Sequence, residues 1–241
     1  MTDTAHLGAS SAPTGGWRRA VVRSVGRDGP RFAVLRLEVD DRIAHLPGQH
    51  YVVRLRAEDG YTASRSYSIA SAPGDDLVEI CVKQLANGEV SEFLADVVQP
   101  GDELEVRGPL GGWFVWDGES PALAVGGGSG VVPLVAMLRH ARETGHRDRI
   151  CLVAAAATHD DLPYVDEILG GCNVVALSRA TAPGGRPAGR LSADDLRPLL
   201  RPDQVVYVCG SAGFAEATTR LLVDLGVAPT AIRVERFGPS A

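Results

Sequence analysis

A short polar segment in the first half of the chain carries residues that suit a planar, phosphorylated ligand. Arg65, Ser66, Tyr67 and Ser68 lie in a stretch with the composition of a β-strand. Alternation along a strand places Arg65 and Tyr67 on one face and Ser68 on the other. A guanidinium group matches a phosphate, and a tyrosine ring suits a flat heteroaromatic group. An ordinary strand with one exposed arginine fits the same residues, so the segment is one candidate among several.

A second candidate lies at the start of a helix-like stretch over residues 89–98. Gly88, Glu89, Val90 and Ser91 begin it. The first backbone N–H groups of a helix have no partner within the helix, and together with a nearby hydroxyl they can cradle a pyrophosphate. A plain helix cap is the alternative interpretation.

A glycine-rich run, Gly126, Gly127, Gly128, Ser129 and Gly130, follows an apolar strand-like run and opens a helical pattern. In a parallel sheet, ligands bind at this position, the carboxyl end of a strand. The run departs from the dinucleotide fingerprint, because Val131 stands where the third glycine belongs and no acidic residue ends the next strand at residues 155–158. It is not a P-loop either, since no lysine follows. The run indicates a phosphate or nucleotide site, or only a tight turn.

Arginines gather after a later apolar run. Ser178 and Arg179 end that run, and Arg186 and Arg190 follow in a loop rich in proline and glycine. Arginines at the carboxyl end of a strand can clamp a phosphate, which would favour NADP over NAD. A solvated loop would have the same composition.

Two more candidates stand near the ends of the last two expected strands. Cys209 and Gly210 end one strand, and Gly210 would let the backbone approach a ligand closely. A buried thiol is the alternative for Cys209. Phe237 follows the last strand, where it could pack in the core or cover a ring-shaped ligand.

The elements that must position the first candidates are short and β-rich. Alternating runs separated by turn residues predict six strands and one helix, which is typical of a small antiparallel barrel. The expected strands cover residues 17–25, 32–39, 51–55, 66–70, 77–83 and 103–106.

From about Trp116 the pattern changes to apolar runs that alternate with helical patterns, which indicates a five-stranded parallel sheet flanked by helices. The expected strands cover residues 122–125, 150–155, 173–177, 205–209 and 232–235, and the expected helices cover residues 133–142, 162–169, 193–200 and 214–225. Ser192 is predicted to cap the third helix, and Asp160 or Asp161 the second. We therefore expect a flexible tail at residues 1–16, a barrel domain at 17–115 and an α/β domain at 116–241.

Composition excludes several classes of protein. A formal net charge of −6 over 241 residues gives no general attraction to nucleic acid or anionic lipid. The start of the chain does not have the pattern of a signal peptide, and no apolar run approaches ~20 residues, so we expect a cytoplasmic protein that does not enter a membrane. The six histidines form no pattern, and no metal site is expected. The four cysteines, Cys81, Cys151, Cys172 and Cys209, lack the spacing of a zinc or iron–sulfur site. Three of them lie in or beside apolar runs and are expected to be buried reduced thiols.

Taken together and in order, the candidates resemble the ferredoxin–NADP reductase family over nearly the whole chain, residues 17–237. The resemblance implies an FAD-binding barrel followed by an NAD(P)-binding α/β domain. It implies that Arg65 meets the flavin pyrophosphate, that Tyr67 packs at the flavin and that Ser68 lies near its reactive N5 atom. The helix start at residues 88–91 is similar to the family's pyrophosphate turn.

The same resemblance assigns the candidates of the second half. The run at residues 126–130 is similar to the family's nicotinamide-dinucleotide loop, and Ser178 with Arg179 resembles its 2′-phosphate contacts. Cys209 with Gly210 resembles the Cys-Gly pair near the nicotinamide. The implied catalytic residues are Ser68, Cys209 and Phe237.

The implied function is that of an FAD-dependent NAD(P)H oxidoreductase. It would pass electrons from NADPH, or NADH, through flavin to an acceptor such as a ferredoxin, a haem protein or a molybdenum protein. Relatives that append a plant-type [2Fe–2S] domain carry cysteines that this chain lacks, so we expect the acceptor on a separate protein or domain. Plant enzymes end on an aromatic residue that covers the flavin, whereas residues 239–241 follow Phe237 here. The alternatives are a non-catalytic flavin-binding regulatory subunit and a plain α/β nucleotide-binding protein. We expect a monomer.

Overall fold

Six strands in the first part of the chain form one antiparallel sheet. They are β1 Arg18–Asp28, β2 Phe32–Val39, β3 His50–Arg56, β4 Thr62–Ser68, β5 Val78–Lys83 and β6 Glu103–Leu110. They pair in the order β4-β3-β6-β1-β2-β5, each antiparallel to its neighbours. The computed structural model describes residues 16–237, so the tail predicted at residues 1–16 lies outside the described residues except for its last glycine.

Contacts between the two edge strands close this sheet into a barrel. Ile69, just after β4, forms an antiparallel bridge with Ile80 of β5. The N–H of Ala70 donates to the carbonyl of Glu79 at 2.8 Å. Closure satisfies backbone groups that an open edge would leave unpaired. The predicted six-stranded antiparallel barrel is confirmed.

The residue pattern of β2 explains why the barrel has an inside. Leu35 and Leu37 are buried, while Arg36 and Glu38 between and beyond them are exposed. Successive side chains of a strand point to opposite faces, so a shift of one residue in the register would turn both leucines to solvent. Burial of each leucine contributes roughly 1.5–3 kcal/mol relative to exposure.

The helical connection of the barrel, predicted at residues 89–98, changes its winding halfway. One α-helical turn, α1 Glu89–Glu92, leads into a wider π-helical turn, η1 Phe93–Val97. The N–H of Val98 donates to the carbonyl of Phe93, five residues back, at 3.1 Å. Val90 and Leu94 from these two turns pack into the barrel core, which fixes the start of α1 against the strands.

The second part of the chain is a parallel sheet with helices on both faces. Its strands are β7 Ala122–Gly127, β8 Ile150–Ala156, β9 Val174–Leu177, β10 Val205–Ser211 and β11 Ile232–Phe237, in the order β11-β10-β7-β8-β9. All neighbouring strands are parallel. The helices are α2 Val132–Glu143, α3 Val165–Ile168, α4 Ala193–Leu196 and α5 Ala212–Asp224. The predicted five-stranded parallel sheet is confirmed.

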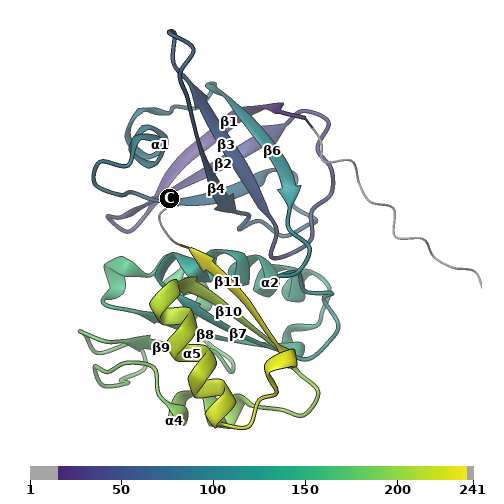
Figure 1. Ribbon diagram of the computed structural model, residues 1–241, viewed down its shortest axis with the longest axis vertical. Coiled ribbons are helices and arrows are strands. Elements are labelled where there is room, and N and C mark those ends of the chain that lie inside the picture. Colours follow the sequence, from purple (N-terminus) through teal and green to yellow (C-terminus); the bar gives the residue numbers. More distant parts are fainter. Residues whose placement is uncertain (1–15, 238–241) are drawn as a thin grey trace, which may run out of the picture.

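Short 3₁₀ turns complete the connections of this domain. They are η2 Gly128–Val131, η3 Arg147–Arg149, η4 His159–Asp161, η5 Arg197–Leu199 and η6 Pro229–Ala231. The strands are apolar on both sides, because α2 packs on one face of the sheet and α5 on the other. In Figure 1, α5 lies in front of the strands and α2 lies between the sheet and the barrel.

One predicted helix start follows the sequence and another departs from it. Ser192 and Asp195 form the capping box predicted for α4. The second helix, predicted over residues 162–169 with Asp160 or Asp161 as its cap, is only α3 Val165–Ile168, and Tyr164 precedes it with a φ of 60°. The capping box here belongs to Thr158 and Asp161 and begins the 3₁₀ turn η4 instead. Local capping signals do not encode the left-handed residue that separates the two turns.

The cysteine expectation needs a correction. Cys151 and Cys172 form a disulfide with their Cα atoms 5.5 Å apart. Val153 of β8 pairs with Val174 of β9, so the two cysteines, each two residues earlier, also stand opposite each other. Sheet register brings them together, and their separation of 21 residues in sequence gave no sign of it. Cys81 and Cys209 are buried free thiols, as expected.

The barrel and the α/β domain stack along the long axis of the molecule, and β11 ends where they meet (Figure 1). The connecting segment at residues 111–121 is anchored by Trp116, which is buried. Its N–H donates to the carbonyl of Pro47 at 3.2 Å, and its indole Nε1 donates to the carbonyl of Ser120 at 2.9 Å. Within residues 16–237, no helix is long and apolar enough to cross a membrane.

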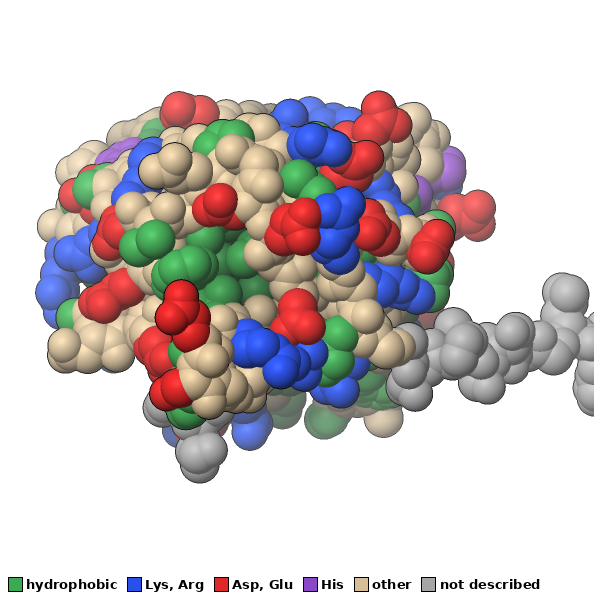
Figure 2. Space-filling model, turned by 90° about the horizontal axis from the view of Figure 1, so that it is seen from above, with side chains coloured by type: hydrophobic (Ala, Val, Ile, Leu, Met, Phe, Trp, Pro, Cys, Tyr) green, Lys and Arg blue, Asp and Glu red, His purple; other side chains and the backbone are tan. Residues whose placement is uncertain are grey.

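Seen from the barrel end, acidic and basic side chains of the described residues are interspersed around an apolar hollow (Figure 2). This face therefore lacks the uniform positive field that nucleic acids require, in agreement with the negative net charge of the chain.

Candidate functional site

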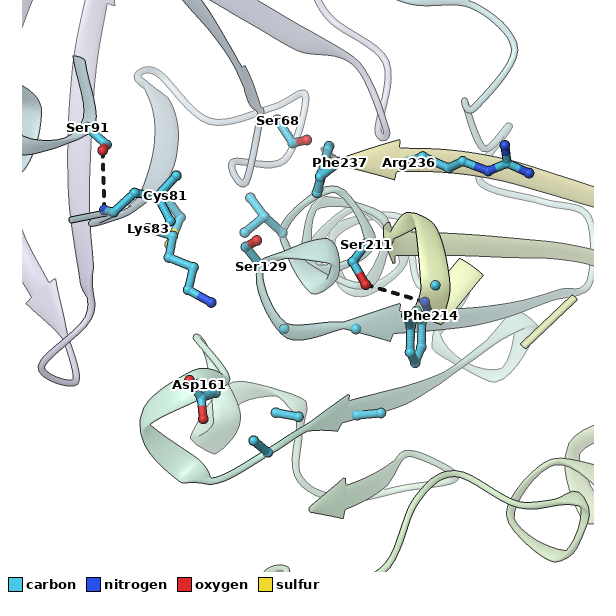
Figure 3. A pocket seen from close by; sticks show the side chains of 18 of the residues that line it. Ser68, Cys81, Lys83, Ser91, Ser129, Asp161, Ser211, Phe214, Arg236 and Phe237 are labelled. Carbon is cyan, nitrogen blue, oxygen red and sulfur yellow. Dashed lines mark hydrogen bonds between the residues drawn. The ribbon is translucent and has the colours of Figure 1, made fainter. Parts of the chain in front are cut away.

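A cavity of about 1250 Å³ lies between the two domains and is lined by both of them. Its barrel side is formed by the ends of β4 and β5 and the start of α1. Its other side is formed by the carboxyl ends of the parallel strands and by the first turns of α5, as the close view in Figure 3 shows. The volume exceeds the roughly 300–1,000 Å³ of an ordinary small-ligand pocket, so the cavity has room for a dinucleotide.

The predicted segment on β4 lines this cavity over its whole length, from Arg65 to Ser68. Ser68 is only 6% exposed, and its hydroxyl has no hydrogen-bond partner among the described residues. A buried polar group without a partner costs about 1–3 kcal/mol, which a bound acceptor or donor would recover. Burial raises the pKa of Tyr67 to about 12, so its ring is neutral at physiological pH. Arg65 donates to the carbonyl of Ser64 at 2.8 Å and stays exposed at the rim.

The predicted helix start also lines the cavity, from Gly88 to Ser91. The Ser91 hydroxyl donates to the carbonyl of Gly88 at 3.0 Å and accepts from the N–H of Leu85 at 3.3 Å. A Cβ at Gly88 would lie 2.4 Å from the Ser91 hydroxyl oxygen, so the turn requires glycine at this position. Ser91 therefore shapes the turn, and the turn presents the helix start to the cavity.

The glycine run divides into a part that lines the cavity and a part that packs behind it. Gly127, Gly128 and Ser129 line the cavity, whereas Gly130 does not. A Cβ at Gly127 would lie 2.6 Å from the ring of Phe214. Close packing of the loop, and not contact with a phosphate alone, therefore explains the glycines.

Cys209 and Gly210 lie in the layer behind this loop. Cys209 is fully buried, and neither residue lines the cavity. Burial raises the pKa of the Cys209 thiol, with the nearby Glu235 carboxyl adding to the effect. Burial was one of the two interpretations of Cys209 from the sequence, and the role near the nicotinamide that the resemblance implies stays a prediction. Ser211, two residues later, lies in the cavity wall.

The arginine loop is also divided. Ser178 and Arg190 line the cavity, whereas Arg179 and Arg186 do not. Arg186 donates to both carboxylate oxygens of Asp195, at 2.7 and 2.8 Å. Its remaining donors reach carbonyls of its own loop, those of residues 187, 189 and 190. Arg186 therefore holds its own loop together, and its contact with a cofactor stays a prediction.

Several lining residues were not singled out from the sequence. On the barrel side they are Cys81 and Lys83 of β5, and on the other side Asp161, Phe214, Thr218 and Arg236. Figure 3 shows the Lys83 side chain projecting into the cavity and Phe237 at the end of β11 pointing toward Ser68. Lys83 ends a strand that was correctly predicted, so the end of β5 was an available signal. Phe214 follows the Cys-Gly pair by four residues in the first turn of α5, but its contact with Gly127 is purely tertiary.

Two family models match the chain in the same order as its two domains. Residues 21–115 match an oxidoreductase FAD-binding domain, and residues 124–220 match an oxidoreductase NAD-binding domain. The chain belongs to the ferredoxin–NADP reductase-like oxidoreductases. The resemblance stated from the sequence is confirmed, and members of this family carry an FAD-binding and an NAD-binding domain.

Curated relatives of this reductase-like chain include a flavohemoprotein of Deinococcus radiodurans, 30% identical over 252 residues, with 96% of this chain and 62% of the relative covered. The reductase component of propane 2-monooxygenase of Rhodococcus jostii is 32% identical over 210 residues, with 79% of this chain and 55% of the relative covered. The chain spans between 54% and 63% of the length of the first four relatives, all flavohemoproteins.

Solved structures of the reductase-like fold superpose over nearly the whole chain. A cytochrome P450 reductase of Amycolatopsis has a TM-score of 0.77 at 25% identity, with 93% of this chain and 70% of that chain covered. A ferredoxin–NADP reductase of Neisseria gonorrhoeae with bound FAD and NADP has a TM-score of 0.79 at 18% identity, with 92% and 99% covered. At this identity the second comparison supports the fold alone.

The residues of the reductase-like cavity fit an FAD and a nicotinamide dinucleotide. The partnerless Ser68 hydroxyl, the glycine-dependent turn at Gly88 and the glycine loop at residues 127–129 are the kinds of group that such ligands engage. No group of three or more His, Cys, Asp or Glu side chains in residues 16–237 could hold a metal ion.

Glu235 of β11 is a half-buried acid beside this site that the sequence did not single out as functional. It pairs with Cys209 in the register of β10 and β11. Burial raises its pKa to about 7, and one of its carboxylate oxygens has no partner among the described residues. Glu235 can therefore hold or release a proton near neutral pH.

Proposed function

We propose that this oxidoreductase is an FAD-dependent NAD(P)H reductase that passes electrons to an acceptor on a separate protein or a separate domain. One observation carries the proposal: a single cavity is lined by the β4 segment of the FAD-binding domain and by the glycine loop of the NAD-binding domain. A bound FAD would accept two electrons from the nicotinamide and release them singly. We place the division between the two domains near Trp116.

In this proposal the barrel residues bind and orient the flavin. Arg65 and the helix start at Gly88 would hold its pyrophosphate, with Lys83 as an additional cation in the cavity. Tyr67 would pack on the ring system. The Ser68 hydroxyl would meet the reactive edge of the ring, since it is buried and without a protein partner. These residues exclude water and fix geometry, which is the main contribution of a protein to such a reaction.

The α/β residues would bind the second dinucleotide. The loop at residues 127–129 would hold its phosphates, and Phe237 would cover the flavin ring until the nicotinamide takes that place. Ser178 and Arg190 line the cavity and suit a 2′-phosphate. We therefore propose that NADPH is preferred over NADH and that Arg190, in place of Arg179 or Arg186, discriminates between them.

The acceptor belongs to an oxygenase or a haem protein in this proposal. Its support is the list of relatives, which includes the reductase component of propane 2-monooxygenase, the electron transfer component of toluate 1,2-dioxygenase and a cytochrome P450 reductase. The flavohemoproteins among the relatives are longer than this chain. A haem domain is therefore as good a candidate for the acceptor as a separate oxygenase protein.

An anaerobic absorbance titration of the purified protein tests the proposal. A yellow protein whose flavin bands bleach on addition of NADPH supports the reductase function, and the same titration with NADH measures the preference. A flavin that stays oxidised with both nucleotides would favour a regulatory subunit. A colourless protein that does not bind added FAD would contradict the flavin assignment.

A further inference from the structure

Glu79 of β5 is a buried carboxylate on which both domains converge. It is 4% exposed. It accepts hydrogen bonds from Arg36 within the barrel at 3.0 Å, from Arg139 of α2 at 2.7 Å and from the hydroxyl of Tyr164 at 2.9 Å. Burial alone would raise the pKa of Glu79, but the charge and hydrogen bonds of Arg139 outweigh it and hold the pKa below its ordinary value. Glu79 is therefore ionised, and it binds the α/β domain through two residues, Arg139 and Tyr164.

Arg139 ties this carboxylate to the α/β domain and to the barrel backbone. It donates to the carbonyl of Ala70 at 2.9 Å and to the two carboxylate oxygens of Glu167 at 3.0 and 2.9 Å. Arg142 donates to the same Glu167 at 2.7 Å. Moving the α/β domain away from the barrel would leave the buried Glu79 carboxylate without its arginine partner, and an unpaired buried charge is unfavourable. These contacts therefore favour one placement of the two domains.

Tyr164 carries the strain of this arrangement. Its φ of 60° lies in the left-handed region, which a residue with a large side chain rarely adopts because it is strained there. Two contacts with the barrel hold it there. Its backbone N–H donates to the carboxylate of Asp28 at 2.5 Å, and its hydroxyl donates to Glu79. The backbone on the nucleotide side of the cavity is therefore shaped by the flavin domain.

The segment that precedes Tyr164, residues 155–161, forms a wall of the cavity. Residues 155–157 and Asp161 line it on the nucleotide side. Asp161 accepts a hydrogen bond from Arg31 of the barrel at 2.6 Å. On the facing side, Cys81 of β5 lines the cavity, and it belongs to the same buried core cluster as Tyr164. In Figure 3, Cys81 and Asp161 lie on opposite sides of the open space.

We infer that Tyr164 is a positioning residue that holds the nucleotide wall of the cavity, residues 155–161, against the flavin wall on β5, and so sets the approach of the nicotinamide to the flavin. The inference rests on the proposed transfer of electrons from the nicotinamide to the flavin for its catalytic consequence. The contact between the walls does not depend on that reaction, and it is measured separately below.

The Tyr164→Phe variant tests this role, because it removes one hydroxyl and keeps the ring. The matched control is Tyr207→Phe, which also removes a buried hydroxyl, here one that donates to the carbonyl of Val115 at 2.9 Å. Neither Tyr207 nor Val115 lines the cavity. Asp28→Ala is a second variant that breaks the other barrel contact of Tyr164 and leaves its side chain unchanged.

The first readout needs no turnover. In the purified oxidised flavoprotein, N-ethylmaleimide should label Cys81, which is 5% exposed, only when the walls separate. We expect labelling roughly three- to tenfold faster in Tyr164→Phe and in Asp28→Ala than in the wild type. Tyr207→Phe should match the wild type. Peptide mass spectrometry separates Cys81 from Cys209, the other free cysteine of the described residues. A wild-type labelling rate in both test variants would overturn the inference.

The second readout is anaerobic stopped-flow with NADPH. In Tyr164→Phe the rate of flavin bleaching at saturating NADPH should fall about tenfold, together with the charge-transfer absorbance of the stacked nicotinamide and flavin rings. KM should change little, because the variant misplaces a nucleotide that is already bound. Faster Cys81 labelling with wild-type bleaching would make Tyr164 a structural contact only and overturn its positioning role. Failure of the wild type to bleach with either nucleotide would contradict the proposed reductase function, while the labelling rates would still decide whether Tyr164 holds the walls together.

Discussion

Gly130 lies directly against the backbone of Cys209: a Cβ built at Gly130 would be 2.3 Å from the carbonyl oxygen of Cys209. Backbone cannot yield as the end of a flexible side chain can. The backbone of the glycine loop therefore lies closer to β10 than any residue other than glycine at position 130 would allow. This contact places residues 127–129 at the cavity.

Gly130→Ala should destabilise the protein by about 2 kcal/mol or more, because overpacking against backbone forces the loop off β10. Urea denaturation measures the loss, and nucleotide affinity should fall with it. Gly112→Ala is the matched control, since a Cβ at Gly112 meets nothing within 4 Å and this residue does not line the cavity. Equal stability of Gly130→Ala and Gly112→Ala would contradict the close approach.

Ser68→Ala should slow flavin reduction about 10- to 100-fold with little loss of bound FAD, because it removes one hydroxyl at the reactive edge and leaves the pyrophosphate contacts in place. Stopped-flow absorbance with NADPH gives the rate, and the ratio of flavin to protein absorbance gives the FAD content. Ser64→Ala, on the same strand but outside the cavity lining, should behave as the wild type. An unchanged rate in Ser68→Ala would remove Ser68 from the site of reaction.

Arg190→Ala should raise the KM for NADPH about 10-fold or more and leave the KM for NADH nearly unchanged, because an arginine–phosphate contact contributes about 1.5–3 kcal/mol. Steady-state kinetics with both nucleotides measure the difference. Arg186→Ala should instead lower stability with no change of preference, since Arg186 is paired with Asp195. If Arg179→Ala and not Arg190→Ala shifts the preference, the family-based assignment of the 2′-phosphate contact holds after all.

Glu235 should make the protein less stable as the pH rises from about 4.5 to about 7. Burial raises the pKa of Glu235 from 4.5 to about 7 in the folded state, so the folded protein retains a proton that the unfolded chain has lost. Stability therefore falls across this window and levels off above it. Glu235→Gln should remove about 1–2 kcal/mol of the difference in unfolding free energy between pH 5 and pH 8, since each pKa unit is worth ~1.4 kcal/mol and solvent screens part of it. Chemical denaturation at both pH values is the test, and an identical pH dependence in the variant would exclude Glu235 as the source.

Reduction of the disulfide between Cys151 and Cys172 should destabilise the α/β domain by about 3 kcal/mol, the value expected for a closed loop of this size. Thermal unfolding with and without a dithiol reductant measures it. Cys151→Ser should show the lower stability in both conditions and no response to reductant. A wild-type protein indifferent to reductant would show that the bond does not persist in solution.

The sequence by itself determined the two-domain plan of this protein. Each of the eleven strands within residues 16–237 overlaps a short apolar or alternating run of the sequence, because the period of a strand and the turn residues that end it are local properties. The β4 segment, the helix start at Gly88 and part of the glycine loop were identifiable for the same reason. In each of these three, the end of a strand or helix exposes backbone and side-chain groups at a position that the local sequence predicts.

Only the tertiary structure decided which candidates reach the cavity. Arg179, Arg186 and Arg190 follow the same strand, yet of the three only Arg190 lines the cavity. Asp195 holds Arg186 within its own loop. The pairing of Cys151 with Cys172 and the convergence of Tyr164 on Glu79 depend on register and on the docking of two domains. Contacts between residues far apart in sequence follow from the packing of whole elements, and no local pattern encodes them.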